Sequence, residues 1–498
     1  MILRFFLFFS FLISRCIGAV DFSIDFFNVG QGNCTVVYFG KNRPLLIVDA
    51  GSSAEDRSHE SSVAMGGGVI AGAGAGGGDD DDEAIAAADF KTRRIRDISD
   101  SIKRDVPSKM LSGLPHINVV ISHGDIDHCN WMVNLVESVG DKKRVRGLLG
   151  GSVDDYSGEE LEPVREFVDR IKRMSDGNVY VKDYGEEEIQ PLYPGGDILC
   201  SILASDTRTR DKNRHSIVLE VGKGPFSAIL TGDAPGKVMD EIPAEKYSRL
   251  PDDGIRIFQA SHHGADSHES NSADLFAALQ PHYCVISAGS RRDYGHPRQR
   301  MIINSLDSSN IKENSVPHLL QYYSDYSFID SHPSLENHLT IGRLENDFVV
   351  GLTRLGIFST ASQGDIHFEN GEFTFSKKPP TGTNETLEIL KLIEDYLEKY
   401  NHFGGSSDLL SFKLPPLTFS SMDDFGAFLE KIPPNVISCD LSRTKLDASI
   451  DHTPVVGLIE RLENLRELEL PSSLNLEAIK KAWVEGGRKL KNLRFILP

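Results

Sequence analysis

Four side chains that bind divalent cations lie within a short stretch of this sequence, directly after an apolar run. The stretch is residues 121–128 (ISHGDIDH), and the four side chains are His123, Asp125, Asp127 and His128. Imidazole nitrogens and carboxylate oxygens are common ligands of divalent metals, and a bound metal with an open coordination position can activate water. The pattern therefore predicts a metal centre able to support hydrolysis.

The ligands follow a predicted strand. Residues 117–121 are short, apolar and rich in β-branched side chains, which indicates a buried strand that ends where the polar residues begin. Predicted strands at 226–230 and 255–258 are likewise followed by metal-binding side chains, Asp233 in one case and the His262–His263 pair in the other. Because α/β folds place their chemistry at strand ends, we expect these segments to meet.

Roles follow from this arrangement. We expect His123 and Asp125 to bind one ion, Asp127 and His128 to serve a second, and Asp233 to bridge both. One histidine of the His262–His263 pair is expected to complete the second site. The other would support it or face the substrate, because adjacent residues on an extended segment point to opposite sides.

The length and composition limit the kinds of protein that this chain can be. A length of 498 residues predicts two or three domains, and 40% hydrophobic with 25% charged residues is typical of soluble globular proteins. The net charge of -20 argues against nonspecific nucleic-acid binding through clustered Lys and Arg, but it allows a local basic patch. The six cysteines are scattered and form neither a disulfide framework nor a CxxC zinc pattern.

The first nineteen residues resemble a cleavable signal peptide, with Arg4, an apolar stretch and small residues up to Ala19. Secretion or export is therefore expected. The alternative is an uncleaved membrane anchor, but the apolar stretch is shorter than the ~20 residues of a spanning helix. No stable membrane span is expected. Residues 52–90 include a Gly-Ala run and an Asp run, and predict a disordered low-complexity insertion.

The C-terminal part has a different pattern. Short apolar segments at 408–414, 435–441, 464–470 and 492–497 recur at steps of 27, 29 and 28 residues, with helical stretches between them. This period resembles leucine-rich repeats, in which each unit supplies a strand and a helix and stacking forms the core. Residues 385–498 are therefore predicted to form a small leucine-rich-repeat-like α/β domain; ordinary α/β packing is the alternative.

Several motifs together carry a resemblance to a known family. They occur in order at residues 28–32 (NVGQG), 48–51 (VDAG), 122–128 (SHGDIDH), 213–216 (NRHS), 231–233 (TGD), 261–264 (SHHG), 294–297 (YGHP) and 359–364 (STASQG). The chain resembles the metallo-β-lactamase superfamily, most closely the hydrolase domain of the competence channel protein ComEC and its stand-alone relatives. The resemblance implies an α/β fold, a four-layer αββα metallo-β-lactamase sandwich over residues 20–378, with metals at one edge of its sheets.

The resemblance also implies ligand roles for the residues named above and a supporting role for the carboxylate of Asp49. Two divalent ions are expected, zinc first. Asp125 stands where the wider superfamily has histidine, and this harder oxygen ligand keeps manganese and magnesium as alternatives. The third superfamily histidine has no clean counterpart. Asn213 and His215 are the nearest candidates, and His215 at a strand start is equally compatible with a supporting role.

The expected function is hydrolysis by a metal-bound hydroxide, held by Asp127 or Asp233. His296 is a candidate to protonate a leaving group or to bind an oxyanion, although Gly295 and Pro297 around it are also typical of a plain turn. Arg291 and Arg292 are candidates for binding a substrate phosphate. Phosphodiesters, including nucleic acid or nucleotides, are the leading substrates.

Two alternatives remain open at this point. One is hydrolysis of a small, non-nucleic ester. The other is a catalytically impaired scaffold whose leucine-rich tail binds a protein partner. No segment of the sequence provides the helices of a membrane channel, so import of DNA by this chain alone is not expected.

Overall fold

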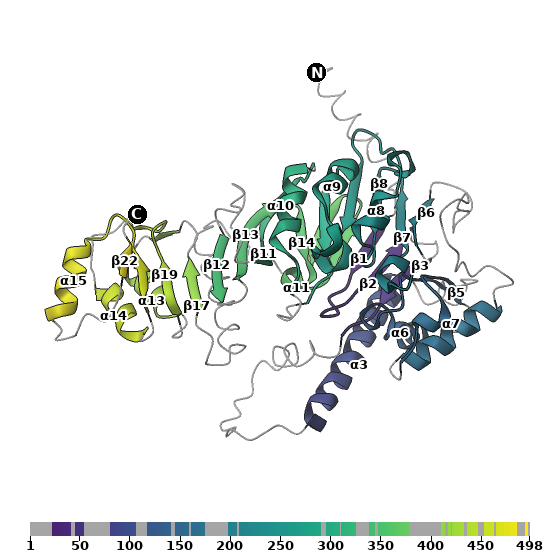
Figure 1. Cartoon of the computed structure of the whole chain (residues 1–498), viewed down its shortest axis with the longest axis horizontal. Helices are drawn as coiled ribbons and strands as arrows, with labels where there is room; N and C mark the ends of the chain where they lie inside the picture. The colour runs from purple at the N-terminus through teal and green to yellow at the C-terminus, as the bar shows by residue number, and fades with distance from the viewer. Residues whose placement is uncertain are drawn as a thin grey trace, which may run out of the picture. The chain divides into compact units, whose positions relative to one another are not determined.

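The computed structural model of the chain describes the residues in the following ranges: 22–40, 45–53, 80–105, 117–140, 145–158, 161–174, 198–206, 209–289, 295–308, 310–324, 338–343, 347–377, 410–413, 417–419, 421–432, 436–446, 453–462, 465–485 and 494–496. The fold is mixed α/β, and the chain divides into two compact units. Unit 1 contains residues 1–296, 304–312 and 356–377, and unit 2 contains the rest. Each unit is described by itself (Figure 1).

Unit 1 contains two sheets. The first has the order β16-β15-β1-β2-β3-β4-β5 and the second the order β14-β10-β9-β8-β7-β6. Strands of the first sheet are β1 (Ser23–Phe26), β2 (Cys34–Tyr38), β3 (Leu45–Ala50), β4 (Ile117–Ile121), β5 (Val145–Leu149), β15 (Ile366–Glu369) and β16 (Glu372–Phe375). Strands of the second are β6 (Ile198–Ala204), β7 (Val218–Lys223), β8 (Phe226–Leu230), β9 (Ile255–Gln259), β10 (Tyr283–Ile286) and β14 (Ile357–Ser359).

A shared apolar core joins the two sheets. Side chains such as Phe26 and Val120 from the first sheet and Leu219 and Val285 from the second belong to one buried cluster. Alternate residues of each strand point to opposite faces, so the same strands also supply a second core on the outer side of the first sheet. Burial on both faces explains why strands such as β4 (INVVI) are almost entirely apolar.

Helices cover the outer faces of the sheets. Those packed against the first sheet are α3 (Asp80–Asp105), α6 (Met132–Val139) and α7 (Glu162–Met174). In α6 the buried residues Met132, Leu135, Val136 and Val139 recur at helical spacing and form its apolar face. On the second sheet, α9 (Ala273–Leu279) packs Phe276 against Phe258 with ring centroids 5.3 Å apart. Figure 1 shows α3, α6 and α7 on one side of the sheets and α8 (Gly236–Asp240) and α9 on the other.

Short helices lie among the remaining connections of the chain. They are α5 (Ile126–Cys129), α10 (Gln299–Ser308), α11 (Thr360–Gln363), and the 3-10 turns η3 (Val153–Asp155), η5 (Lys212–His215), η6 (Ala244–Lys246), η7 (Ser261–Gly264) and η8 (Ser267–Glu269). Among the described residues, no helix combines the length and apolar character needed to cross a membrane. The five described cysteines are all buried and unpaired as disulfides.

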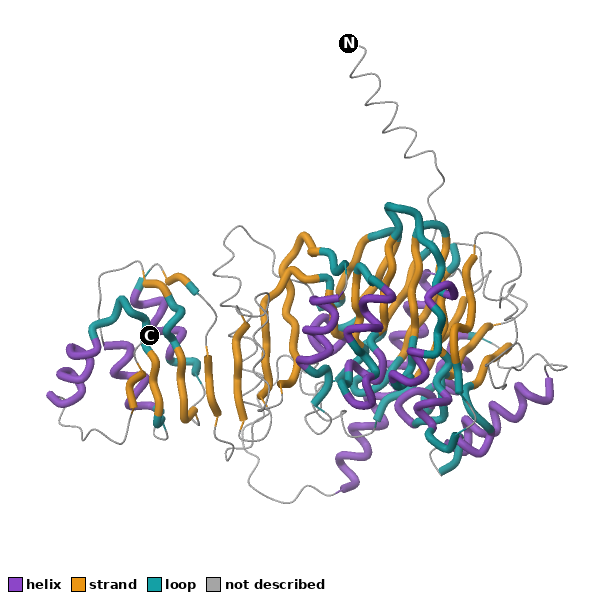
Figure 2. The backbone as a smooth tube through the Cα atoms, turned by 45° about the horizontal axis from the view of Figure 1, so that its top comes forward, coloured by secondary structure: helices purple, strands orange, loops and turns teal. Residues whose placement is uncertain are grey.

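Unit 2 contains one seven-stranded sheet, in which an antiparallel part continues into a parallel part. The antiparallel strands are β11 (Glu313–Ser324), β13 (Asp347–Leu355) and β12 (His338–Arg343), and β12 pairs with the first parallel strand. The parallel strands are β17 (Leu410–Lys413), β19 (Val436–Asp440), β21 (Glu467–Glu469) and β22 (Arg494–Ile496), with α13 (Met422–Leu429), α14 (Thr453–Arg461) and α15 (Leu476–Glu485) between them. A small sheet pairs β18 (Thr418–Phe419) with β20 (Lys445–Leu446). Figure 2 shows this alternation of strand and helix.

Two sequence boundaries differ from the structure. Residues 313–355 group with the C-terminal residues, not with the hydrolase-like part to which the sequence assigned them, because β12 forms a ladder with β17. The predicted disordered insertion at 52–90 lies outside the described residues over 54–79, but residues 80–90 belong to α3. Helix α3 packs against the first sheet through the buried side chains of Phe90, Ile95, Ile98 and Ile102. The proposed signal peptide lies outside the described residues.

Candidate metal centre

The metal-binding side chains lie at the carboxyl ends of parallel strands. In the first sheet β3 and β4 are parallel, and they end next to Asp49 and His123. In the second sheet β8 and β9 are parallel, and they lead into Asp233 and His263. Carboxyl ends of parallel strands meet at one edge of a sheet, and this brings together residues that are far apart in the sequence.

The loop after β4 turns directly into a short helix. Asp125 is the N-cap residue of α5, but its side chain makes no capping hydrogen bond. The first turn of α5 then presents Asp127 and His128. Gly51 allows this helix to lie against β3, because a Cβ at Gly51 would be 2.5 Å from the backbone nitrogen of His128. The loop and the strand end are therefore in backbone contact.

The turn that carries Asp233 also needs a glycine. Gly232 has φ of +53°, and a Cβ there would be 2.7 Å from Cβ of Ser122. Glycine adopts positive φ without steric strain. His262 and His263 also have positive φ, 51° and 55°, which is unfavourable for residues with a Cβ by about 1–3 kcal/mol each. Such strained backbone often accompanies functional sites.

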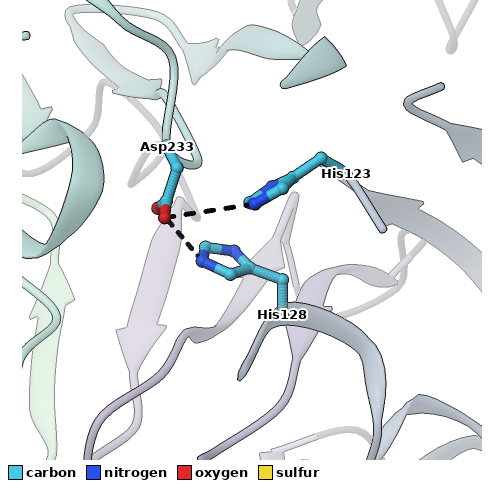
Figure 3. Close-up of side chains that lie close together, drawn as sticks. All are labelled: His123, His128 and Asp233. Carbon is cyan, nitrogen blue, oxygen red and sulfur yellow. Dashed lines mark ion pairs between the residues drawn. The ribbon is translucent and has the colours of Figure 1, made fainter. Parts of the chain in front are cut away.

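Two groups of side chains bring their ligand atoms close enough to hold a metal ion. The first group is His123, His128 and Asp233, and the second is Asp127, His128 and His263. Within each group the ligand atoms all lie within 4.8 Å of one another. Figure 3 shows the first group, with both histidine rings directed toward the carboxylate of Asp233. His128 belongs to both groups.

Asp233 is the carboxylate at the centre of these histidines. Its Oδ1 lies 3.0 Å from Nε2 of His128 and 3.8 Å from Nε2 of His263. Its Oδ2 lies 4.0 Å from Nε2 of His123 and 3.7 Å from Nε2 of His262. One carboxylate with each oxygen directed toward two imidazoles has the disposition of a bridging ligand.

The three buried histidines each use Nδ1 for a contact with the protein. His128 Nδ1 donates to Asp49 Oδ2 at 2.9 Å, and His263 Nδ1 donates to the carbonyl of Ser287 at 2.6 Å. His123 Nδ1 lies 3.1 Å from Oγ of Ser122. The acceptors at Nδ1 of His128 and His263 place a proton on that nitrogen, so any second proton is on Nε2 and must leave before Nε2 can bind a metal. All three Nε2 atoms are therefore directed at the ligand groups.

Three atoms of the first group lack a hydrogen-bond partner although they are buried. They are Nε2 of His123, Nε2 of His128 and Oδ1 of Asp233. His128 Nε2 and Asp233 Oδ1 are 3.0 Å apart, so they form an ion pair when His128 is protonated, without the geometry of a regular hydrogen bond. Buried polar atoms are normally paired, and each exception needs an explanation. A cation between these atoms would satisfy all three, so the donor set fits a metal.

The buried carboxylates and histidines of the site shift one another's pKa values. Burial raises the pKa of Asp233, but His128, His263 and His262 lower it more, and this pKa lies well below its usual value. Burial lowers the pKa of His128, whereas Asp233 and Asp49 raise it well above the ordinary value. In the same way burial lowers the pKa of His263, but Asp233 and Asp127 raise it overall. Without metal, protonated histidines therefore neutralise the buried carboxylates.

We expect metal affinity to rise with pH as a result. His128 and His263 have raised pKa values, so their protons must leave before Nε2 can bind a metal. Each displaced proton should increase the apparent affinity by up to about tenfold per pH unit, as long as the pH is below the raised pKa of the histidine that loses it. Calorimetric titration of metal in buffers of different ionisation enthalpy measures the protons released. An affinity that does not change over this range would contradict the assignment.

The stability of the metal-free protein should change in the opposite direction. A raised histidine pKa stabilises the folded state below the unfolded value of about 6.5, and this contribution is lost as pH rises through the folded pKa. The increase in Tm on adding metal should therefore be larger at about pH 8 than at about pH 6. Thermal melts with and without metal at the two pH values give this difference.

Asp125 and His262 lie beside the ligand groups. Asp125 Oδ2 is 3.4 Å from Nε2 of His123, but Asp125 does not belong to either group of the described residues. Burial raises the pKa of Asp125, but His123 and Lys212 lower it, to about 2 overall. His262 is 25% exposed, and burial lowers its pKa despite the opposing effect of Asp233. Of the two adjacent histidines, His263 is thus in a ligand group and His262 is at its open side.

His262 and His263 differ in role, as expected, but not because they alternate on an extended segment. His262 and His263 are not on an extended segment but in left-handed backbone conformation within η7. His296 lies near His262, with ring centroids 5.7 Å apart. The site is therefore flanked by two histidines that are outside both ligand groups.

His215 lies away from both ligand groups. Its Nε2 is 2.8 Å from the carbonyl of Thr209, and its Nδ1 is 3.2 Å from Oδ2 of Asp155. The backbone N–H of Asn213 donates to Asp211 at the start of η5. His215 is not in either ligand group of the described residues, because its imidazole contacts the loop of η5. Arg291 and Arg292 lie outside the described residues.

Asp49, to which the family resemblance gave a supporting role, belongs to a buried polar network whose other members were not predicted from the sequence. Asp49 Oδ1 accepts from the backbone N–H of Ser122 at 2.6 Å, and its Oδ2 accepts from Ser122 Oγ at 2.8 Å and from Asn33 Nδ2 at 3.0 Å. Gln259 from the second sheet donates to Asn33 Oδ1 at 2.8 Å. Ser216 Oγ accepts from the backbone N–H of Asp233 at 3.1 Å. Only the position of these residues next to ligand motifs could have suggested such roles.

Comparisons with known proteins give one similarity in sequence. No family model matches the chain. Over 200 residues, 40% of the chain, it is 26% identical to ComE operon protein 3 of Bacillus subtilis (strain 168), and the match covers 23% of that protein. The chain therefore matches about a quarter of the length of this relative. This similarity agrees with the resemblance to a competence protein that the motifs indicated.

A solved structure that aligns with most of the chain has a low TM-score. It is the crystal structure of a protein of unknown function from Enterococcus faecalis V583. The match covers 96% of this chain and 98% of that one, with 11% sequence identity and a TM-score of 0.25.

Proposed function

We propose that this protein is a metal-dependent hydrolase of phosphodiesters. The observation that carries the proposal is the convergence of buried ligand atoms of His123, His128 and Asp233, which lie within 4.8 Å of one another. These side chains come from separate segments of the chain, and Nε2 of His123 has no hydrogen-bond partner although it is buried. Two imidazole nitrogens and a carboxylate oxygen directed at one point form a donor set for a divalent cation.

Two divalent ions are proposed; His123 would hold one, Asp127 and His263 the other, Asp233 would be available to both, and the single free lone pair of His128 Nε2 would serve one of them. Zinc is the first candidate because histidine nitrogens dominate the donor set, and manganese or magnesium are alternatives because of its carboxylates. When bound, such ions lower the pKa of a coordinated water to about 7 and polarise the substrate oxygen. Asp125 is proposed as a further ligand that turns toward His123.

The residues of the chain have distinct proposed roles. Asp127 and Asp233 accept hydrogen bonds from the attacking water and hold it in position. Asp127 is 20% exposed and is itself held by Nε2 of His263 at 3.2 Å, so it can face both the ligands and the substrate. His296 donates a proton to the leaving group. Asp49 orients His128, and Arg291 and Arg292 are proposed to bind the substrate phosphate.

The fold is proposed to be the four-layer αββα sandwich of the metallo-β-lactamase superfamily. Two core-sharing sheets, outer helices and ligands at strand ends support it. The parallel strands and helices of the C-terminal region support a leucine-rich-repeat-like domain, which we propose binds a protein partner. The N-terminal segment is proposed to direct export or secretion.

Phosphodiesters are proposed as substrates because the motifs of the chain resemble the ComEC type of hydrolase, and the similarity to ComE operon protein 3 agrees with that resemblance. Nucleic acid and nucleotides are both included in this class. Carboxylic esters are the alternative substrates, and the experiment below includes one of them. Loss of all hydrolysis with intact folding would instead favour the scaffold alternative.

The test is a metal-dependent activity screen on the full chain. Protein stripped with a chelator is reloaded with zinc, manganese or magnesium, and its metal content is measured. Single-stranded DNA, RNA, bis(p-nitrophenyl) phosphate and p-nitrophenyl acetate are the substrates. We expect phosphodiester turnover that disappears on chelation and returns with metal.

The variant Asp127→Ala tests the proposed role of Asp127 in holding the attacking water. We expect turnover to fall about 10²–10⁴-fold, the usual contribution of a positioned acid–base group. Asp154→Ala is the control, because Asp154 is a 93% exposed aspartate on η3. Equal turnover in Asp127→Ala and the unmodified protein, or no stoichiometric metal in the latter, would refute the proposal.

A further inference from the structure

Lys212 lies directly beside the loop that carries the proposed metal ligands. Its Nζ donates to the carbonyl of Gly124 at 3.2 Å and lies 3.4 Å from Oδ1 of Asp125. The other oxygen of Asp125 is 3.4 Å from Nε2 of His123. One carboxylate therefore separates the ammonium group from a nitrogen of the first ligand group.

The loop of Lys212 is held in place by its own contacts. Lys212 is the first residue of η5, where the Asp211 side chain accepts from the backbone N–H of Asn213 at 3.1 Å. At the other end of η5, buried His215 contacts the carbonyl of Thr209. Residues that the sequence suggested as ligands thus anchor the turn that presents a lysine at the centre. The position of the lysine is set by the fold and not only by its flexible side chain.

The Lys212–Asp125 pair lies on the open side of the centre. The side chains of Lys212 and Asp125 are 34% and 38% exposed, whereas His123 is 0% and His128 is 1% exposed. A pair with this exposure is worth only about 0–1 kcal/mol, and a new partner can replace it with little loss. A substrate that approaches the centre from solvent can therefore contact Nζ of Lys212.

The charge balance of the site indicates why a positively charged side chain beside it would help to bind an anionic substrate. The carboxylates of Asp49, Asp125, Asp127 and Asp233 carry four negative charges at the centre. Two divalent cations would balance these charges and leave no excess positive charge for an anionic substrate. An ammonium group beside the ligand loop supplies one, and lysine is a common point-charge partner of phosphate oxygens.

We propose that Lys212 binds a non-bridging phosphate oxygen of the substrate and thereby selects phosphodiesters over uncharged esters. The inference rests on the proposed hydrolase function and deepens it. In the absence of substrate, Asp125 and the Gly124 carbonyl hold the ammonium group. When substrate binds, the phosphate oxygen takes the place of Asp125 as partner of Nζ, and Asp125 keeps its other oxygen directed toward His123.

Anion binding to the metal-loaded full chain tests the proposal without requiring turnover. Inorganic phosphate and dimethyl phosphate are titrated calorimetrically into the unmodified protein and into Lys212→Met, Lys212→Arg and Lys246→Met. Lys246 is an exposed lysine of η6, and its replacement is the control for the same change in net charge. Metal content is measured for every variant.

We expect Lys212→Met to bind both phosphates about 10–100-fold more weakly, the usual contribution of a charge-assisted hydrogen bond. Lys212→Arg should retain most of the affinity, and Lys246→Met all of it. Metal content should be unchanged in each. In activity assays, kcat/KM of Lys212→Met should fall for bis(p-nitrophenyl) phosphate but not for p-nitrophenyl acetate.

Three results would overturn the proposal. They are unchanged phosphate affinity in Lys212→Met, loss of metal in parallel with phosphate affinity, and the absence of phosphate binding by the unmodified metal-loaded protein. Loss of metal would instead make Lys212 a tether for Asp125. If the unmodified protein binds phosphate through Lys212 but hydrolyses no ester, the hydrolase function fails while the anion site stands.

Discussion

Replacing His128 by alanine is expected to weaken metal binding at the centre and to lower hydrolysis strongly. The single free Nε2 of His128 lies in both candidate groups, so the ion that it binds would be left with two side chains of its group. Removing even a group that supports a ligand lowers metal affinity or activity about 10–100-fold, and we expect the loss of a ligand itself to have at least that effect on turnover. Metal analysis and phosphodiesterase assays of the same preparation measure both effects.

The same change should also destabilise the metal-free protein. His128 lies between Asp49, at 2.9 Å, and Asp233, at 3.0 Å, and all three residues are buried. Removing one partner of a buried charged cluster typically lowers the free energy of unfolding by about 3–5 kcal/mol. Chemical denaturation with chelator present measures this term separately from metal binding.

A different buried histidine provides the control for His128. His215 is 3% exposed and is paired with Thr209 and Asp155, outside both groups. The variant His215→Ala should lose stability but keep its full metal content. Full metal binding by His128→Ala, or loss of metal by His215→Ala but not His128→Ala, would reverse the ligand assignment.

Replacing Asp49 by asparagine is expected to have the second largest effect. Asp49 is fully buried and accepts from the backbone and side chain of Ser122, from Asn33 and from His128. An asparagine amide nitrogen would face one of these donors with a donor of its own, which leaves both without an acceptor. If that donor is Nδ1 of His128, the imidazole loses the contact that leaves Nε2 available for metal.

We expect Asp49→Asn to lower metal affinity about 10–100-fold, the range measured when a carboxylate behind a ligand histidine is removed. The free energy of unfolding should fall as well, by about 3–5 kcal/mol, because His128 would lose a buried charged partner. Metal titration followed by competition with a chelator gives the affinity, and denaturation gives the stability.

The chain contains a matched control for this substitution too. Asp25 is 6% exposed and accepts from Nδ1 of His367 at 2.5 Å, which makes it another buried aspartate paired with a histidine. Asp25→Asn should reduce stability while metal affinity stays unchanged. If both variants bind metal equally well, Asp49 is not a determinant of the orientation of His128.

Much of unit 1 could be predicted from local patterns. The expected strands at 117–121, 226–230 and 255–258 agree closely with β4, β8 and β9. These strands are short and apolar, and Gly or Ser follows each within two residues, so local composition identifies both the strand and its end. The strands that the repeat pattern predicted near 435–441 and 464–470 also match β19 and β21.

The long-range connections could not be predicted in this way. Pairing of β12 with β17 joins residues 340–343 to residues 410–413 and moves residues 313–355 into unit 2. Strand partners depend on which exposed edge meets which, and nothing in the local sequence encodes that choice. The same limit applies to His215, which has the residue type of a ligand but is directed to Thr209 by the turn of η5.

The sequence by itself determined the chemistry that is available: histidines and aspartates placed just after apolar strands, in an order that resembles a metal-dependent hydrolase. Only the tertiary structure decided which of them share a site. It placed His128 and Asp233 at the centre, left Asp125 at the edge with Lys212, and kept His215 apart. The reason is physical, because ligation depends on distances between side-chain atoms from separate strands, and those distances exist only after the two sheets have packed on their common core.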